Sequence, residues 1–257
     1  MKIKVVENPP VDPREFDLPA GFKEEHLEDV VEIFNTPLVG HYNWDYTDAD
    51  TRIKKLYELG KELNWNGSID LDWSNGLKKG EPPIKADLIA RMEGPLAALP
   101  EEERLEYMRH DQAWTLSQFL HGEQGAMLVA SQLVSCAPTY QAKLYAASQT
   151  FDEARHVEVF ARYLKEIHGL EYPINKNLKA LIDKILSDER WDLKFIGMQI
   201  IIEGLALAAF QTTKETSNCP LLRQLVHYVI RDEARHVTFG VNYLQDFLKT
   251  LSKQEVE

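Results

Sequence analysis

The chain has little cysteine. Its 257 residues include only Cys136 and Cys219, which do not have the close spacing of a paired or metal-binding motif. This scarcity argues against a disulfide framework or a thiolate metal site, and we assign neither cysteine a chemical role. The first ten residues also lack an apolar run long enough for a secretion signal. We therefore expect a cytoplasmic protein.

Positive charge and long apolar runs are also scarce. The chain has 29 basic and 41 acidic residues, a net charge of −12, which repels phosphate backbones and anionic lipid. The longest apolar stretch, Phe195 to Phe210, contains Gln199 and Glu203, so it is short and polar for a membrane span. We expect no nucleic-acid or membrane partner, and we interpret this stretch as a helix buried on nearly all sides.

Helix breakers are concentrated in residues 1–100, where prolines and aromatic residues indicate loops and short helices. One helix is expected there at about 48–63. It either caps a site or, as we favour, packs on the outside of a bundle. Residues 101–257 have longer periodic segments, with expected helices at about 101–135, 139–168, 191–216 and 220–251 and a shorter one near 176–188. We predict an all-α protein: an N-terminal aromatic- and proline-rich extension, 1–100, packed on a four-helix bundle, 101–257.

One hexapeptide, Asp-Glu-Ala-Arg-His-Val, occurs twice in the second part of the chain. Each copy follows a lone glutamate at the same distance, since Glu123 lies thirty residues before Glu153 and Glu203 lies thirty before Glu233. The whole pattern is repeated at an offset of eighty residues. This repeat predicts two antiparallel helical hairpins that each supply half of one site.

The turns between the helices set the level of these residues. A proline, Pro138 or Pro220, lies almost midway between the two glutamates of each half. If each proline marks a turn, both glutamates of a half lie roughly 22 Å of helix from it, at about 1.5 Å per residue. Glutamate and histidine of each hexapeptide are three residues apart, on one helix face. The predicted ligands of a two-metal site are Glu123, Glu153, His156, Glu203, Glu233 and His236.

The surroundings of Glu203 support a metal site independently. This residue follows three isoleucines and precedes a run of small and apolar residues. An unpaired carboxylate in such a core would cost several kcal/mol. Coordination of a cation removes that cost, and four carboxylates balance the charge of two divalent ions.

The hexapeptides also contain an aspartate and an arginine each. Metal-bound imidazoles often donate their second N–H to a carboxylate, so the aspartates are expected behind the histidines. The arginines are expected to pair with them, or else to lie on an exposed helix face. These four residues are Asp152, Asp232, Arg155 and Arg235. His121 and His227 lie off the ligand face by helical phase, and we interpret both as structural.

The doubled Asp-Glu-x-Arg-His pattern resembles the ferritin-like di-iron carboxylate superfamily over residues 101–251. It resembles the bacterial multicomponent monooxygenases and related oxygenases more than the ferritins. The resemblance implies a ferritin-like bundle holding two iron ions, or a Mn/Fe pair, with some glutamates bridging. It implies one iron at Glu123, Glu153 and His156 and the other at Glu203, Glu233 and His236.

Three positions depart from relatives in this superfamily. Ribonucleotide reductase small subunits have a radical tyrosine four residues after the first histidine, where this chain has Phe160. The monooxygenases have a threonine four residues after the third glutamate, where this chain has Leu207. The arylamine N-oxygenases have an additional histidine ligand at the position of Val229. The resemblance therefore supports neither a tyrosyl radical, nor that threonine's role, nor a seventh protein ligand.

The resemblance implies an O2-dependent oxidoreductase of monooxygenase type that oxidises a small, apolar organic substrate. The sequence has no Gly-rich dinucleotide fingerprint and no cysteine cluster, so we expect electrons from a separate reductase or ferredoxin. A homodimer is a further expectation. Small residues near the glutamates would leave room for the substrate or serve close helix packing: Gly125, Ala126, Gly204 and Ala206.

Three alternative functions remain open at this stage. A ferroxidase or iron-storage protein would assemble into a cage and take up far more than two irons per chain. A ribonucleotide reductase small-subunit-like oxidase would use a Mn/Fe centre. A two-metal hydrolase would need neither O2 nor a reductant, although ligation rich in carboxylates favours iron or manganese over zinc.

Overall fold

The structure is a computed structural model that describes residues 34, 36, 38–47, 51–249 and 252. Thr36–Glu257 forms one compact unit. Its described residues form helices and loops, and the single β-bridge found among them joins Ile84 to Ser217. The prediction of an all-α fold is confirmed.

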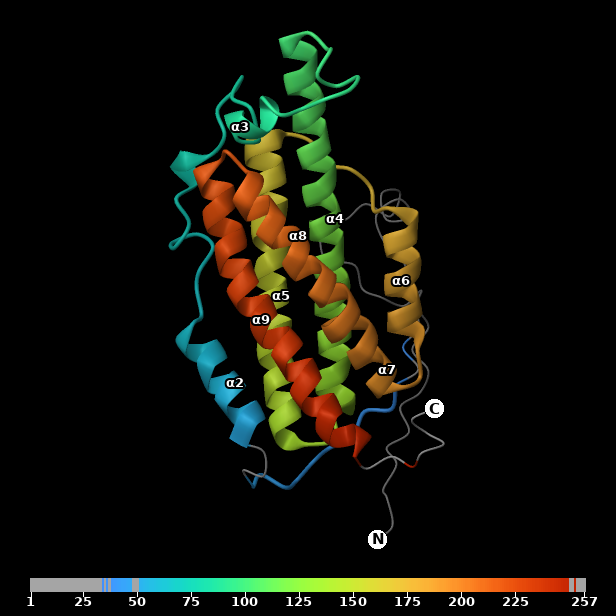
Figure 1. Ribbon diagram of the computed structural model, residues 1–257. Coiled ribbons are helices and arrows are strands. Elements are labelled where there is room, and N and C mark those ends of the chain that lie inside the picture. Colours follow the sequence, from blue (N-terminus) through green and yellow to red (C-terminus); the bar gives the residue numbers. More distant parts are fainter. Residues whose placement is uncertain (1–33, 35, 37, 48–50, 250–251, 253–257) are drawn as a thin grey trace, which may run out of the picture. The chain divides into compact units, whose positions relative to one another are not determined.

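Four long helical segments run side by side and form a bundle (Figure 1). They agree closely with the predicted ranges and follow the predicted order. The first hairpin consists of α4 (Glu101–Cys136) and α5 (Tyr140–Tyr163), which is extended by the π-helical turn η4 (Leu164–His168). The second hairpin consists of α7 (Trp191–Phe195), the π-helical segment η5 (Ile196–Ile202), α8 (Glu203–Thr216) and α9 (Pro220–Leu248).

Both prolines lie at the turns where the sequence placed them. The hydroxyl of Thr139, directly after Pro138, caps α5 by accepting the N–H of Ala142 at 3.2 Å. Helix α9 begins at Pro220 and is capped by the sulfur of Cys219. Proline is tolerated at this first position because its missing N–H would have no partner within the helix. The two turns therefore place the repeated glutamates at one level of the bundle.

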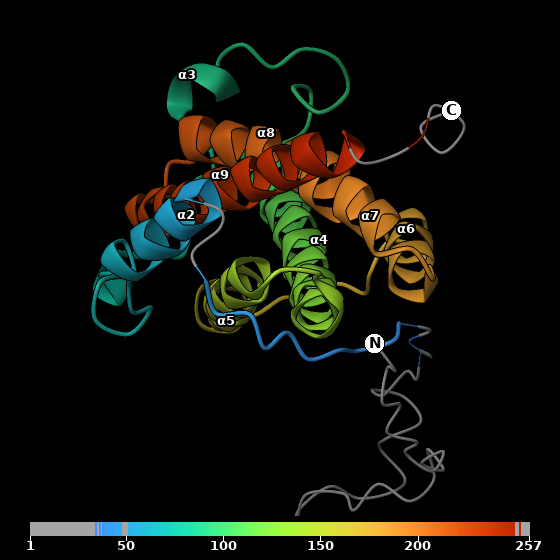
Figure 2. The ribbon, with the colours of Figure 1, turned by 90° about the horizontal axis from the view of Figure 1, so that it is seen from below.

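Shorter helices pack around the bundle (Figure 2). Helix α2 (Thr51–Glu62) contacts α5 and α9, as expected for packing on the outside, and α6 (Lys176–Ser187) contacts α4. Residues 48–50 of the predicted helix 48–63 lie outside the described residues. So do residues 1–33, and the division of the chain at residue 100 remains a prediction. The remaining short helices are η3 (Trp73–Asn75) and α3 (Ala86–Ile89).

The apolar core has two parts, separated along the helices by the level of the hexapeptides. One cluster includes Tyr145, Phe195 and Phe239. The other includes Phe160, Phe210 and many residues from the first half of α9. The polar side chains of the site are thus enclosed between two apolar layers, which keep water out and lower the local dielectric.

One described helical segment, Trp191–Thr216, is long and apolar enough to cross a membrane by length and composition alone. Here it packs against α9, and Glu203 in its middle is buried. The expectation that the stretch Phe195 to Phe210 is buried on nearly all sides is wrong, because Ile196, Ile201 and Leu205 are exposed. The segment lies at the edge of the bundle, so only one of its faces meets the core. The expectations of no membrane partner and of a cytoplasmic location remain predictions.

Substitution of two glycines of α4 would show how closely this helix packs against α6. A β-carbon at Gly125 would lie 2.8 Å from Ile182 Cδ1 and 2.9 Å from its Cγ2, whereas one at Gly122 would meet no atom within 4 Å. The branched side chain of Ile182 is stiff, so Gly125→Ala should lower the free energy of unfolding by about 1–3 kcal/mol through overpacking. Gly122→Ala should raise it by about 0.5–1 kcal/mol. Denaturant unfolding of the metal-free variants checks both, and equal effects would contradict the close contact with α6.

Candidate metal centre

All six predicted ligand side chains meet inside the bundle, and each is at most 5 % exposed. They come from four helices: Glu123 from α4, Glu153 and His156 from α5, Glu203 from the start of α8, and Glu233 and His236 from α9. They form two overlapping groups, and the potential ligand atoms within each group lie within 4.8 Å of one another. The groups are Glu123, Glu153, His156 and Glu233, and Glu153, Glu203, Glu233 and His236.

The two groups share the glutamates of the repeated hexapeptide. Glu153 and Glu233 belong to both groups, whereas Glu123 and Glu203 each belong to one. This arrangement suits two adjacent cations, with the shared carboxylates between them. The sequence left open which glutamates would bridge, and Glu153 and Glu233 are the two that could contact both ions.

The two histidines are oriented by hydrogen bonds at their far nitrogens. His156 Nε2 lies 3.1 Å from Asp232 Oδ2, while its Nδ1 faces the glutamates, 3.0 Å from Glu123 Oε2. His236 Nε2 lies 3.3 Å from Asp152 Oδ2, and its Nδ1 lies 3.1 Å from Glu153 Oε1. Because an ionised aspartate can only accept, each Nε2 carries a proton. The neutral form of each imidazole therefore has its lone pair on Nδ1, the atom that would bind a cation.

These hydrogen bonds cross between the halves of the repeat. The histidine of each hexapeptide donates to the aspartate of the other one, and each arginine bonds both aspartates. Arg155 Nη2 donates to Asp152 Oδ1 and, at 2.9 Å, to Asp232 Oδ2. Arg235 Nη2 donates to Asp152 Oδ2 at 2.9 Å and to Asp232 Oδ1 at 2.8 Å. The four residues lie behind the histidines as predicted, and all are at most 5 % exposed.

Crowded charges shift the proton affinities of the site in the metal-free chain. Burial, followed by the charge of Glu233, raises the pKa of Glu123 and of Glu203 well above the usual range for glutamate. Burial lowers the pKa of His156 and of His236, but the neighbouring carboxylates more than offset it, so both pKa values are raised. The cluster therefore retains protons when no cation balances its charge.

The atoms left without partners fit metal ligation. Within the described chain, four buried atoms of this cluster make no hydrogen bond of normal geometry: Glu153 Oε2, Glu203 Oε2, Glu233 Oε1 and His236 Nδ1. Three of them lie 3.1–3.3 Å from another ligand atom of the cluster, and Glu203 Oε2 has no such neighbour among the described residues. Buried polar atoms in folded proteins nearly always have a partner. Carboxylate oxygens with a few imidazole nitrogens are ligands that suit iron and manganese. The donor set thus fits the predicted dinuclear metal.

Gln149, which was not predicted from the sequence, lies on α5 one turn before Glu153. Its Nε2 donates to Glu203 Oε1 at 2.7 Å and to Glu153 Oε1 at 3.2 Å, and the side chain is fully buried. The residue eighty positions later is Val229, so the repeat gave no signal for it. Only its helical phase, four residues before a predicted ligand, could have pointed to it.

Trp65, which was also not predicted from the sequence, reaches the site from the segment after α2. Trp65 Nε1 donates to Asp232 Oδ2 at 2.7 Å, on the same oxygen that faces His156. Its ring stacks on Tyr228 with the centroids 5.0 Å apart, and the Arg155 guanidinium lies 4.7 Å from the ring centroid. No local pattern connects positions so distant in sequence, so only the fold reveals this contact.

Several residues considered in the sequence lie outside the cluster. His121 Nε2 bonds the carbonyl oxygen of Tyr172 at 2.8 Å, and His227 is exposed beside Lys214. Neither belongs to the two groups, which agrees with a structural role. Phe160 and Val229 are fully buried apolar neighbours.

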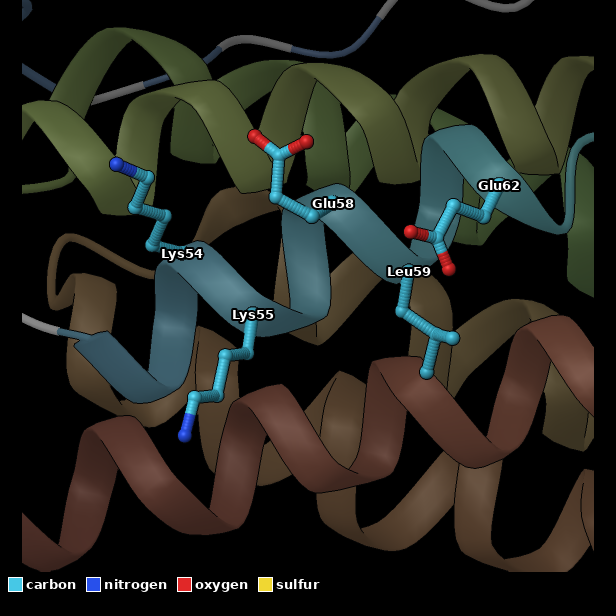
Figure 3. Close-up of a pocket in the computed structure, with 5 residues that line it drawn as sticks. All are labelled: Lys54, Lys55, Glu58, Leu59 and Glu62. Atoms are coloured by element: carbon cyan, nitrogen blue, oxygen red, sulfur yellow. The ribbon is translucent and has the colours of Figure 1, made fainter.

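A surface hollow lies on the outer side of α2, away from the cluster (Figure 3). It is lined by Lys54, Lys55, Glu58, Leu59 and Glu62. Four of these five side chains carry charge, and all belong to one helix. The hollow includes none of the predicted site residues.

Metal binding should release protons. Since the pKa values of Glu123, Glu203, His156 and His236 are all raised in the metal-free chain, a divalent cation must displace the protons they hold. The apparent affinity for Fe(II) or Mn(II) should therefore rise with pH across the neutral range and fall as the pH is lowered. Anaerobic titration with simultaneous measurement of released protons checks this, and an affinity independent of pH would contradict it.

Comparisons with known proteins agree with this site. A sequence model described as P-aminobenzoate N-oxygenase AurF matches residues 46–257, well over half of the chain. No curated protein sequence matches the chain.

Solved structures show a similar fold. A mutant of an R2-like ligand-binding oxidase with aerobically reconstituted Mn/Fe cofactor is 22% identical, with a TM-score of 0.58, over 81% of this chain and 76% of that chain. Another mutant, with anaerobically reconstituted Mn/Fe cofactor, is 22% identical and has a TM-score of 0.59. The match covers 81% of this chain and 79% of that chain. These likenesses show that the chain shares the helical fold of those structures. The match to the sequence model assigns the family: the chain belongs to the P-aminobenzoate N-oxygenase AurF family, and it is an O2-dependent oxidoreductase of the ferritin-like di-iron superfamily.

Proposed function

We propose that this enzyme uses O2 to oxidise a small, apolar organic substrate at a paired metal site, with electrons from a separate reductase or ferredoxin. The observation that carries the proposal is the pair of overlapping carboxylate and histidine groups enclosed between two apolar core layers. The proposed metal ligands are Glu123, Glu153, His156, Glu203, Glu233 and His236.

In this proposal the protein holds the ions and controls what reaches them. A bound pair of reduced iron ions, or a Mn/Fe pair, would supply the electrons for reduction of O2. The aspartates and arginines behind the histidines keep each Nε2 protonated and each Nδ1 aimed at the site. The apolar layers exclude water, which strengthens the electrostatic interactions of the buried ligands and limits side reactions.

An apolar substrate is supported by the residues on one side of the cluster. Phe119 packs against Phe160 and Phe210 with ring centroids 5.9 Å and 4.7 Å away, and Val229 belongs to the same buried cluster. Apolar side chains next to reacting groups favour apolar ligands, because a polar ligand would lose its hydrogen bonds to water. The family description names p-aminobenzoate, an aromatic amine that also carries a carboxylate. It supports a small aromatic substrate, whose ring the apolar side chains would contact.

The central test combines metal counting with O2 chemistry. Protein loaded anaerobically should contain two iron ions per chain, react with O2 and transfer labelled oxygen to substrate when a reductase is present. Uptake of far more than two irons in a cage would favour iron storage, and turnover without O2 or reductant would favour a hydrolase. Glu203→Ala should lose at least one ion, whereas Glu215→Ala, an exposed position on the same helix, should keep both. Retention of two ions by Glu203→Ala would contradict the ligand set.

Electron supply from a partner is supported by the contact between Trp65 and Asp232. The stacked pair of Trp65 and the half-buried Tyr228 connects the protein surface with the aspartate that orients His156. This connection has no counterpart at Asp152 among the described hydrogen bonds. A homodimer remains a prediction from the sequence.

Removal of the indole N–H tests this connection. Trp65→Phe keeps an aromatic ring but loses the hydrogen bond to Asp232, and we expect reduction of the oxidised centre by an external donor to slow by about tenfold or more. Trp73→Phe is the matched control, because its N–H donates to Gly67 O, outside the hexapeptide network. Stopped-flow reduction measures both rates. Equal rates in the two variants would exclude Trp65 from electron supply.

A further inference from the structure

The two faces of the metal cluster differ chemically, although the ligands repeat. Four residues before a predicted ligand, α5 has Gln149 where α9 has Val229. Four residues before the lone glutamate of each half, η5 has Gln199 and α4 has Phe119. Two amides thus lie on one face of the cluster, and two apolar side chains lie on the other.

Gln149 is placed to hold two carboxylates of different helices with one amide group. Its two N–H bonds go to Oε1 of Glu203 at 2.7 Å and to Oε1 of Glu153 at 3.2 Å. The side chain is fully buried, so water does not compete for these bonds. Hydrogen bonds from a neutral donor to a charged acceptor are among the stronger ones in proteins.

Gln199 fixes Gln149 from behind. Its Nε2 donates to Gln149 Oε1 at 3.3 Å, and this side chain is also fully buried. Gly240 on α9 makes room for it, because a β-carbon there would lie 2.5 Å from Gln199 Cβ. The residue eighty positions before Gly240 is Phe160, so the apolar face has a bulky ring at the equivalent place.

The two oxygens of each carboxylate that Gln149 contacts have different hydrogen-bond partners. Oε1 of Glu153 and of Glu203 accepts a hydrogen bond from Gln149, whereas Oε2 of each accepts none from the described residues. Oε1 of Glu153 also lies 3.1 Å from His236 Nδ1, and its Oε2 lies 3.3 Å from His156 Nδ1. Neither Glu123 nor Glu233 accepts a bond from a side-chain amide among the hydrogen bonds of the described residues. The carboxylates of the apolar face therefore have more freedom to rearrange than those of the amide face.

We propose that Gln149, supported by Gln199, is a positioning residue that orients Glu153 and Glu203 toward the metal site and makes the two metal positions inequivalent. The position of Glu203 and His236 is the constrained one, and the position of Glu123 and His156 is the adaptable one. This inference rests on the metal site and not on the proposed oxygenation, because its test needs neither O2 nor substrate.

The test is metal binding by Gln149→Met, which keeps the side-chain length and removes both N–H groups. Anaerobic Fe(II) titration should show that the ion held by Glu203 binds about 10- to 100-fold more weakly, the usual effect of losing a hydrogen bond to a metal ligand. The other ion, which shares only Glu153 with this network, should lose clearly less affinity. Mössbauer spectra of the iron-loaded wild type should show two distinct iron environments, which become more alike in the variant. Gln149→Glu should weaken the same ion further, because a carboxylate there repels Glu153 and Glu203.

Gln132→Met is the matched control. Gln132 is also a buried glutamine, but it donates to Leu186 O and lies nine residues beyond Glu123 on α4. This variant should bind both ions as the wild type does, even if its thermal stability falls. If Gln149→Met does not fold, Gln199→Met supplies the test, with a smaller loss at the same ion. Unchanged affinities and spectra, or equal weakening of both ions, would overturn the proposal, whether or not the enzyme oxidises a substrate.

Discussion

The structure depends on the burial of four carboxylates and two imidazoles in a helical core. Bringing such groups out of water costs several kcal/mol for each charge unless an opposite charge and hydrogen bonds replace the solvent. In this protein two sets of groups replace the solvent. Cations can lie between the glutamates, and the aspartates and arginines form hydrogen bonds behind the histidines. The rest of the helical bundle holds the glutamates and the aspartate–arginine network at the same level.

The crossed bonds explain how two copies of one hairpin act as a single site. Each histidine depends on the aspartate of the other copy, and each arginine joins both aspartates. Neither half can orient its own imidazole alone. The two hairpins must therefore pack together before the site exists, so its assembly is linked to the tertiary fold.

Duplication would give two equivalent metal positions, but three additions break this equivalence. Trp65 binds Asp232, an amide pair holds Glu153 and Glu203, and apolar rings line the opposite face. Each addition occupies a position that the repeat does not preserve. The two metal positions thus have matching ligands but different neighbouring residues. These neighbours allow substrate binding and electron supply to take place on different sides of the site.

The sequence alone determined the helices, their order and the six side chains that meet, because these follow from local periodicity, proline turns and a repeat with fixed spacing. It also placed Asp152 and Asp232 behind the histidines, since the hexapeptide carries them with the ligands. Only the tertiary structure decided which aspartate serves which histidine, that Trp65 reaches Asp232, and that Gln149 joins two glutamates. It also showed that one face of Trp191–Thr216 is exposed. These outcomes depend on how separate helices are rotated and stacked against one another, and no pattern within a single helix encodes that arrangement.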